Sequence, residues 1–412
     1  MVAACGGDDG DGFVVEGTSG QQVAAAFPGW VPEVRGGIGA EDHFMLVDTG
    51  APITILDRSA FPQFTMDGKY DVDWRAFGLT FPAFEAVSYD IFAAPPGPTS
   101  DDGLIGGTLL THFAVRFDYQ GGHAAIWRDE SPPAGDANLV SAGVDVPFDL
   151  LGGGLSYVPG NCPGMDHCGT MQVPPTRILL QAYFEGQSEP QWVLVDSGAS
   201  AIATSASFIA SLPGNGTTRP QLDGIAITTA NGVVDASLTR VFRTRIGEGD
   251  AQLALDDLPV LVLPTDDLLN AISDEVDRPI VALFGGTFLR EFLTTIDYPE
   301  RKLTLEKYRA RTHIPTAEYV GVGFTLQSSA SGTWIIGDVY SGSDAEVQGL
   351  APGQTVEEIE HMSITGLSHA SVNALFDGHA IGTTVAVGVL VAGDVVTKDV
   401  AVEDLLPSYP AP

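Results

Sequence analysis

Basic residues are scarce in this chain of 412 residues, where 19 Lys and Arg stand against 53 Asp and Glu and leave a net charge of −34. So acidic a protein repels phosphate backbones and anionic head groups, which excludes nucleic acid as a partner and removes electrostatic attraction to a membrane. We interpret the acidity as an adaptation of the surface to solubility or salt. A preference for basic substrates is the alternative.

Long hydrophobic runs are absent as well, and no stretch approaches the roughly 18 apolar residues of a membrane-spanning helix. The sequence has no His-Glu-x-x-His pair, no Gly-x-Ser-x-Gly elbow and no phosphate-binding Gly-Lys-Ser/Thr loop. These absences exclude three common kinds of catalytic or nucleotide-binding motif. We expect neither a metal nor a cofactor, and we interpret His43 and His112 as surface or supporting residues.

Cysteine is rare, with three in the chain. Cys162 and Cys168 flank a turn-rich loop that a disulfide could close, which predicts an exported protein. His167 lies beside Cys168, but two thiols and one histidine without a further cluster make a poor zinc site.

Cys5 follows Val2-Ala3-Ala4 and precedes a run rich in Gly and Asp. This pattern resembles a bacterial lipobox with its flexible tether, which implies lipidation of Cys5 and anchoring in the bacterial cell envelope, facing the periplasm or the exterior. Only four residues precede Cys5, so the basic and apolar parts of a signal peptide are missing from this sequence. An incidental free thiol is the alternative.

Two stretches of the chain are nearly alike. Residues 44–51 and 192–199 each consist of a four-residue apolar run, an aspartate, a small hydroxyl residue, a glycine and an alanine. A short apolar run that ends in a glycine turn predicts a buried strand. Its terminal carboxylate, Asp48 or Asp196, is costly to bury unless it is paired or hydrogen-bonded. Two such tips facing each other would let one carboxylate hold a proton for the other.

A second pair of similar segments follows in the same order. Residues 104–113 and 283–292 both contain Gly-Gly-Thr, and both reach Asp-Tyr twelve residues after the first glycine. We predict a strand, a glycine turn, a short helix with Thr108 or Thr287 as its N-cap, and a further strand. A duplication in fixed order predicts two homologous lobes.

Together these motifs resemble those of the retropepsin-like aspartic proteases, over roughly residues 31–308. The resemblance implies that Asp48 and Asp196 form the catalytic dyad that holds the attacking water. Thr49 and Ser197 would brace the two catalytic loops through their hydroxyl groups. The dyad shares one proton, because two adjacent carboxylates do not ionise together readily.

The resemblance also assigns four glycines. Gly50 and Gly198 would allow a close backbone approach that a Cβ would block. Gly106 and Gly285 lie where the family threads a strand behind each catalytic loop. The implied mechanism is general acid–base attack of water on a peptide bond, without a covalent intermediate. Retroviral enzymes pair two chains, whereas this chain holds both lobes, so we expect an active monomer.

The second lobe is longer, since Asp196 lies 89 residues before Gly285 whereas Asp48 lies 58 residues before Gly106. Within the extra length, residues 227–236 predict two strands around an Asn-Gly turn, and Asn231 and Gly232 are the flap candidate. In the first lobe the turns at Asp67-Gly68 and Phe77-Gly78 are alternatives that the sequence does not separate.

The last hundred residues resemble a PDZ domain of the bacterial form. Apolar residues alternate with glycines from Val320, and a turn, a short helix and a second turn follow over residues 341–354. The resemblance implies that an extended peptide adds to a sheet edge and that backbone N–H groups hold its C-terminal carboxylate. A small β domain with a structural role is the alternative. The implied peptide-binding residues are Gly321, Val322, Gly323, Phe324, Val372, Leu375 and Phe376.

The sequence therefore predicts a mainly β, two-lobed protein of the retropepsin or pepsin type, followed by a small α+β PDZ domain. The expected segments are a lipobox and tether (1–22), a first lobe (23–135), a second lobe (136–312) and the PDZ domain (313–412). We predict an aspartic endopeptidase acting on polypeptides, with peptide C-termini as partners of the PDZ domain. A non-catalytic peptide-binding envelope protein with the same scaffold is the alternative.

Overall fold

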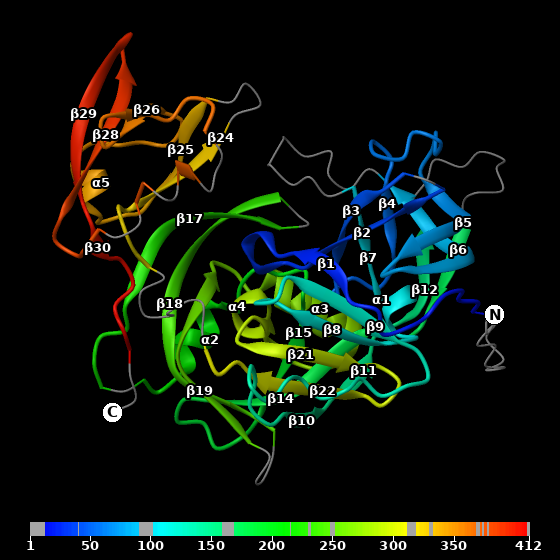
Figure 1. Cartoon of the computed structure of the whole chain (residues 1–412). Coiled ribbons are helices and arrows are strands. Elements are labelled where there is room, and N and C mark those ends of the chain that lie inside the picture. The colour runs from blue at the N-terminus through cyan, green and yellow to red at the C-terminus, as the bar shows by residue number, and fades with distance from the viewer. Residues whose placement is uncertain are drawn as a thin grey trace. The chain divides into compact units, whose positions relative to one another are not determined.

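The computed structural model describes residues 13–39, 41–89, 102–158, 169–214, 216–229, 232–247, 252–310, 319–328, 333–367, 371–372, 375–376 and 379–409. Strands dominate it and the helices are short, which confirms the prediction of a mainly β protein (Figure 1). Within these residues no helix has the length and apolar character needed to cross a membrane. Cys5, Cys162 and Cys168 lie outside the described residues, so lipidation and the disulfide remain predictions.

The strands of the first half are β1 (Val23–Ala26), β2 (Glu33–Ile38), β3 (His43–Val47), β4 (Ile55–Asp57), β5 (Gly68–Ala76), β6 (Leu79–Tyr89), β7 (Gly103–Ile105), β8 (Ala114–Asp118), β9 (His123–Trp127), β10 (Val144–Pro147), β11 (Asp149–Leu151), β12 (Gly154–Val158), β13 (Gly169–Val173), β14 (Arg177–Phe184), β15 (Gln191–Val195) and β16 (Ala203–Ser205). The later strands are β17 (Gln221–Thr229), β18 (Gly232–Ile246), β19 (Leu253–Leu263), β20 (Ile280–Phe284), β21 (Phe292–Asp297), β22 (Lys302–Lys307), β23 (Val320–Gly321), β24 (Phe324–Ser328), β25 (Trp334–Val339), β26 (Thr355–Ile359), β27 (Met362–Ser363), β28 (Thr384–Val391), β29 (Asp394–Ala401) and β30 (Glu403–Asp404). The helices are η1 (Pro28–Trp30), α1 (Gly107–Leu110), α2 (Ala206–Ser211), α3 (Asp267–Val276), α4 (Gly286–Leu289) and α5 (Asp344–Val347).

By the density of its contacts the chain divides into two compact units. The first contains Met1–Thr204, Arg245–Ala254 and Asp267–Thr312, and the second contains Ser205–Thr244, Leu255–Asp266 and His313–Pro412. The C-terminal residues thus belong to the same unit as the hairpin formed by β17 and β18. The domain boundaries predicted near residues 135 and 312 remain predictions.

The two repeated sequence segments have the same strand arrangement within the first unit. Strand β7 lies between β3, to which it is parallel, and β4, to which it is antiparallel. Strand β20 likewise lies between β15 and β16, parallel to the first and antiparallel to the second. Each copy therefore brings its Asp-x-Gly turn and its Gly-Gly-Thr turn to the same end of three adjacent strands.

Strands β8 and β21, which follow the two Gly-Gly-Thr helices, pair with each other in an antiparallel ladder. Arg116 pairs with Thr295, and these two residues are equivalent when Gly106 is matched with Gly285. Ala114 pairs with Asp297, and the equivalents of these two residues, Leu293 and Asp118, pair with each other. Such a register is self-complementary, as at a two-fold axis.

In the second unit, β17 and β18 form the predicted hairpin, with Thr229 paired to Gly232 at its tip. Asn231 lies outside the described residues, so the flap assignment is untested. The C-terminal sheet has the order β24-β25-β26-β28-β29. Its core includes Trp334, Ile336 and Ile359.

The predicted helix-and-turn segment after residue 341 is confirmed by α5, whose N-cap Ser343 accepts a hydrogen bond from the N–H of Glu346. The segment in which apolar residues alternate with glycines forms two strands, β23 and β24, and Gly323 between them has a φ of +73°. A turn with positive φ at Glu360 and His361 likewise separates β26 from β27.

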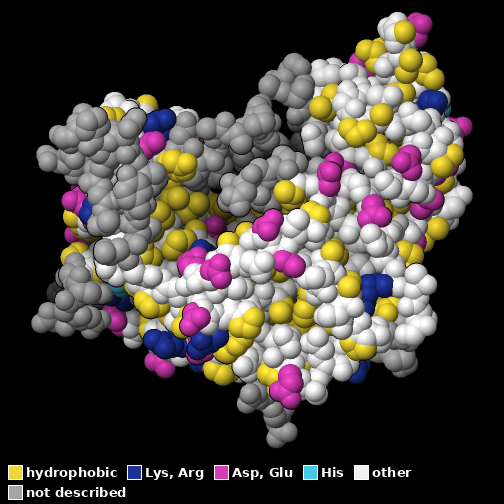
Figure 2. Space-filling view, turned by 180° about the vertical axis from the view of Figure 1, so that it is seen from behind, with side chains coloured by type: hydrophobic (Ala, Val, Ile, Leu, Met, Phe, Trp, Pro, Cys, Tyr) yellow, Lys and Arg dark blue, Asp and Glu magenta, His cyan; other side chains and the backbone are white. Residues whose placement is uncertain are grey.

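Among the described residues on the face drawn in Figure 2, acidic side chains are scattered and form no single patch. A scattered distribution favours a general surface adaptation over a dedicated acidic binding site on this face.

Candidate active site

Strands β3 and β15 carry Asp48 and Asp196 at their ends. Each aspartate continues the parallel ladder by one bond: the N–H of Asp48 donates to the carbonyl of Ile105 at 3.0 Å, and that of Asp196 donates to the carbonyl of Phe284 at 3.1 Å. Val47, Val195 and these two acceptor residues are fully buried. The apolar runs therefore fix both aspartates at the edge of a packed core, as predicted.

The two turns lie against each other. A Cβ on Gly50 would overlap the carboxyl group of Asp196, with Oδ2 at 2.6 Å, and a Cβ on Gly198 would overlap that of Asp48 with Oδ2 also at 2.6 Å. Each carboxyl group therefore occupies the space that the glycine of the other turn leaves open. The structure brings together the four residues that the sequence analysis placed in one site.

Thr49 and Ser197 form a reciprocal brace between the turns. The N–H of Thr49 donates to Oγ of Ser197 at 3.0 Å, and the N–H of Ser197 donates to Oγ1 of Thr49 at 2.9 Å. Each hydroxyl then donates across the site, Thr49 to the carbonyl of Val195 at 3.2 Å and Ser197 to that of Val47 at 2.6 Å. Both residues are fully buried, so these four bonds hold the turns where water does not compete.

Local backbone donors orient the carboxyl groups. Oδ1 of Asp48 accepts from the N–H groups of Gly50 at 2.7 Å and Ala51 at 3.0 Å. Oδ1 of Asp196 accepts from the N–H of Gly198 at 2.9 Å. In both turns Oδ1 is engaged with the aspartate's own loop.

The two carboxyl groups have unequal electrostatic surroundings. Burial is the largest cause that raises the pKa of Asp48, and the negative charge of Asp196 and a hydrogen bond between the carboxyls raise it further. Burial also raises the pKa of Asp196, but its hydrogen bond with Asp48 opposes this. The two carboxyl groups titrate together, and one shared proton relieves the repulsion between them.

We expect the wild-type protein to lose stability relative to Asp48→Asn as the pH rises above about 4. The unfolded Asp48 releases its proton near its ordinary pKa of 3.8, whereas the folded site retains it. The stability contributed by that proton is complete below pH 3.8 and is lost as the pH rises through the raised pKa. The difference in unfolding free energy should change by at most about 1.4 kcal/mol per pH unit. Urea unfolding of both proteins from about pH 4 to 8 measures it, and parallel curves would contradict the shared proton.

Gly106 and Gly285 lie directly behind the two turns. A Cβ on Gly106 would lie 2.9 Å from the carbonyl oxygen of Ala51, and one on Gly285 would overlap the carbonyl oxygens of Ala199 and Ala201. The loop that leaves each turn is therefore too close to admit a side chain on either glycine.

The prediction that Thr108 and Thr287 are N-caps is wrong. The N-caps of α1 and α4 are Gly106 and Gly285, neither of which has a side chain to cap with. The two threonine hydroxyls instead accept from loop N–H groups, Thr108 from Thr54 at 3.0 Å and Thr287 from Ile202 at 2.8 Å. These bonds fasten each helix to the loop that leaves the neighbouring Asp-x-Gly turn. The repeated sequence alone did not reveal this role.

Arg177 and Tyr298 are two residues near the dyad to which the sequence analysis gave no role. The Arg177 guanidinium lowers the pKa of both aspartates and makes a bidentate ion pair with Glu275, at 2.9 and 2.8 Å. Tyr298 is buried, and burial together with the charges of Asp48 and Asp196 raises the pKa of its phenol. Tyr298 belongs to the repeated Asp-Tyr pair, which was a visible signal, whereas no pattern distinguished Arg177.

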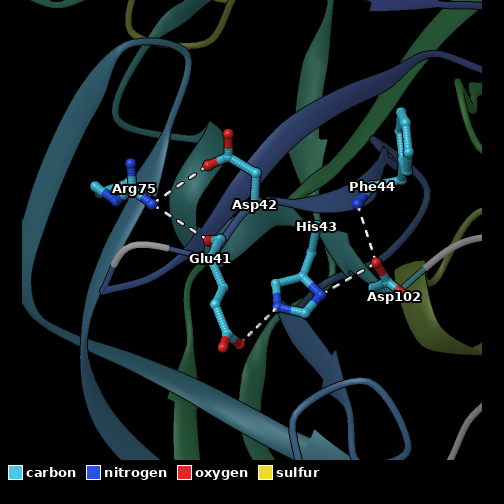
Figure 3. A network of polar contacts seen from close by, with 6 residues as sticks. All are labelled: Glu41, Asp42, His43, Phe44, Arg75 and Asp102. Atoms are coloured by element: carbon cyan, nitrogen blue, oxygen red, sulfur yellow. Dashed lines mark hydrogen bonds and ion pairs between the residues drawn. The ribbon is translucent and has the colours of Figure 1, made fainter.

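His43 begins β3, at the end of the strand that lies away from Asp48. Its Nδ1 lies 3.1 Å from Oδ2 of Asp102, which also accepts from the N–H of Phe44 at 3.2 Å (Figure 3). Arg75 extends the network to Asp42 at 3.3 Å. His112 stacks on Phe13 with ring centroids 3.9 Å apart. The interpretation of both histidines as supporting residues agrees with these contacts.

The predicted peptide-binding residues of the C-terminal domain are partly brought together. Phe324 begins β24, and its ring lies 6.1 Å from that of Phe376 in an edge-on arrangement. Leu375 and Phe376 are partly buried at the margin of the core. Val372 is fully buried within that core, so it supports the neighbouring side chains rather than facing a ligand directly.

Among the described residues no group of three or more His, Cys, Asp or Glu could hold a metal ion. No curated protein matches the chain. A crystal structure of the aspartic proteinase from Irpex lacteus is similar over 72% of this chain and 99% of that chain, with 13% sequence identity and a TM-score of 0.42. Residues 180–287, which contain Asp196, Gly198 and Gly285, match the model of the aspartyl protease family.

Proposed function

We propose that this protein is an aspartic endopeptidase that hydrolyses peptide bonds with a water held between Asp48 and Asp196. The observation that carries the proposal is the mutual approach of the two turns, in which each carboxyl group fills the space beside the other turn's glycine. Two carboxyl groups with raised pKa values and one shared proton supply both an acid and a base at the same place.

In the proposed reaction the ionised carboxylate takes a proton from the water as its oxygen attacks the carbonyl carbon of the substrate. The protonated carboxyl donates its proton to the carbonyl oxygen, which gives a neutral tetrahedral intermediate. Proton transfer to the amide nitrogen then allows the C–N bond to break, and the dyad recovers its single proton. Arg177 helps to keep one of the two carboxyls ionised, since it lowers the pKa of each.

Both carboxyl groups come from one chain, so we propose that a monomer is sufficient for activity. We further propose that the C-terminal domain binds peptide C-termini. In its favour, β24 pairs only with β25 among the described strands and ends its sheet, as an edge that accepts a further strand must. Attachment to the bacterial envelope through Cys5 stays part of the proposal.

Cleavage of an unstructured protein such as casein tests the proposed activity. Wild type and Asp48→Asn should be assayed between about pH 3 and 8, because the dyad works only while it holds one proton. We expect cleavage by wild type and a loss of at least about a hundredfold in the variant. Equal rates at every pH would reject the enzyme and favour the non-catalytic peptide-binding alternative.

A further inference from the structure

After β30, residues 405–409 form a tail that lies against two strands of the same unit. After β30, Leu406 is fully buried and Tyr409 is 2% exposed, although neither belongs to a strand. Their neighbours include Arg240 in β18 and Asp257 in β19. A buried tail of this kind costs conformational entropy, so specific contacts must hold it.

A charged pair makes those contacts. The Arg240 guanidinium is fully buried, and its Nε donates to the carbonyl of Leu406 at 3.0 Å. Its second nitrogen donates to the carbonyl of Asp257 at 2.9 Å and lies 3.5 Å from that residue's carboxylate. The carboxylate in turn accepts from the hydroxyl of Ser408 and the N–H of Tyr409, both at 2.7 Å. A buried charge is costly unless it is paired and hydrogen-bonded, and the tail supplies part of that pairing.

The aromatic ring at the end of the tail is held as well. Tyr409 lies 6.1 Å from the ring of Phe242, and the guanidinium of Arg219 lies 4.7 Å above it. Arg219 also donates to the carbonyl of Arg240 at 2.6 Å. We call Leu406, Ser408 and Tyr409, with Arg240 and Asp257, the tail latch.

A second contact joins the hairpin to the C-terminal domain. The N–H of Ser341, just after β25, donates to the carbonyl of Asp223 in β17 at 3.1 Å. The next residue, Gly224, forms a bulge with a φ of +86°, and a Cβ there would lie 2.8 Å from the carbonyl oxygen of Val339. The hairpin is therefore fastened to this domain at β17 and, through the latch, at β18.

We infer that the β17–β18 hairpin and the C-terminal domain behave as one cooperative element, and that the tail latch couples them. The latch and the bond from Ser341 to Asp223 hold both strands of the hairpin to this domain, so neither part opens to solvent without breaking these contacts. A peptide bound by the C-terminal domain, as proposed above, would then also stabilise the hairpin.

Hydrogen exchange of the full-length protein tests the coupling without any assay of activity. The double variant Ser408→Ala/Tyr409→Ala removes two latch contacts but leaves Arg240 paired with Asp257, so the fold should persist. We expect backbone amides of β17 and β18 to exchange about tenfold faster than in wild type, while those of β15 keep their rates. Arg243→Ala is the matched control, since Arg243 lies on the same strand and forms an exposed pair with Asp256 at 2.7 Å.

Unchanged exchange in the hairpin would overturn the coupling, and so would an equal acceleration throughout the chain, because the tail would then only add stability. A wild type without peptidase activity would reject the proposed function, while the exchange rates would still decide the coupling.

Discussion

Replacing Asp196 by asparagine should lower the turnover of casein by at least about a thousandfold, and the double variant Asp48→Asn/Asp196→Asn should be no slower than either single variant. In the proposed reaction the two carboxyl groups act as one unit, because the acid and the base must both be present in the same step. Once one is lost, the other has no productive partner. Initial rates at the pH optimum of wild type measure both effects.

Asparagine keeps the size and the acceptor oxygen of aspartate, so the bond from the N–H of Gly198 can remain. Unfolding near neutral pH should therefore show no loss of stability in Asp196→Asn. Asp149→Asn, on exposed β11, is the control and should retain full activity. Losses that multiply in the double variant would show that the two aspartates act separately, and the shared-proton mechanism would then be wrong.

Alanine at Gly285 or Gly106 should lower the free energy of unfolding by about 3 kcal/mol or more, and activity should fall with it. The added methyl group meets backbone carbonyls of the loop behind each catalytic turn, and backbone cannot rotate away as a side chain can. The loop must therefore move, and the dyad with it. Denaturant unfolding and casein cleavage measure the two effects.

Gly321→Ala is the control for this substitution, because its Cβ would find its nearest neighbour, a leucine side-chain atom, at 3.8 Å. We expect a change in unfolding free energy within about 0.5 kcal/mol. A Gly285→Ala protein as stable as Gly321→Ala would refute the close threading of β20 behind the turn.

The dyad, its brace and the four glycines could be predicted because the chain repeats them. A motif that occurs twice, in the same order and with the same flanking residues, constrains both copies to one geometry. The sequence alone therefore predicted that Asp48 and Asp196 lie side by side. The mainly β architecture followed from short apolar runs bounded by glycines, which is a strong signal for buried strands.

The tail latch could not be predicted in the same way. Arg240, Asp257 and Tyr409 are far apart in the sequence and belong to no repeat, and arginine and aspartate are usually exposed. The roles of Thr108 and Thr287 were misjudged for a related reason. A threonine near a helix start suits an N-cap, and only the position of the neighbouring loop shows that its hydroxyl is used elsewhere.

The ladder between β8 and β21 bears on whether the two repeated segments are equivalent. At its centre Arg116 pairs with its own equivalent, Thr295, and Nε of Arg116 donates to Oγ1 of Thr295 at 2.8 Å. Two identical halves would carry the same residue at both places, and two arginines would set two buried guanidinium groups against each other across the axis. Because both segments belong to one chain, the two places can carry a donor and an acceptor instead. This asymmetric pair makes the two repeated segments no longer interchangeable.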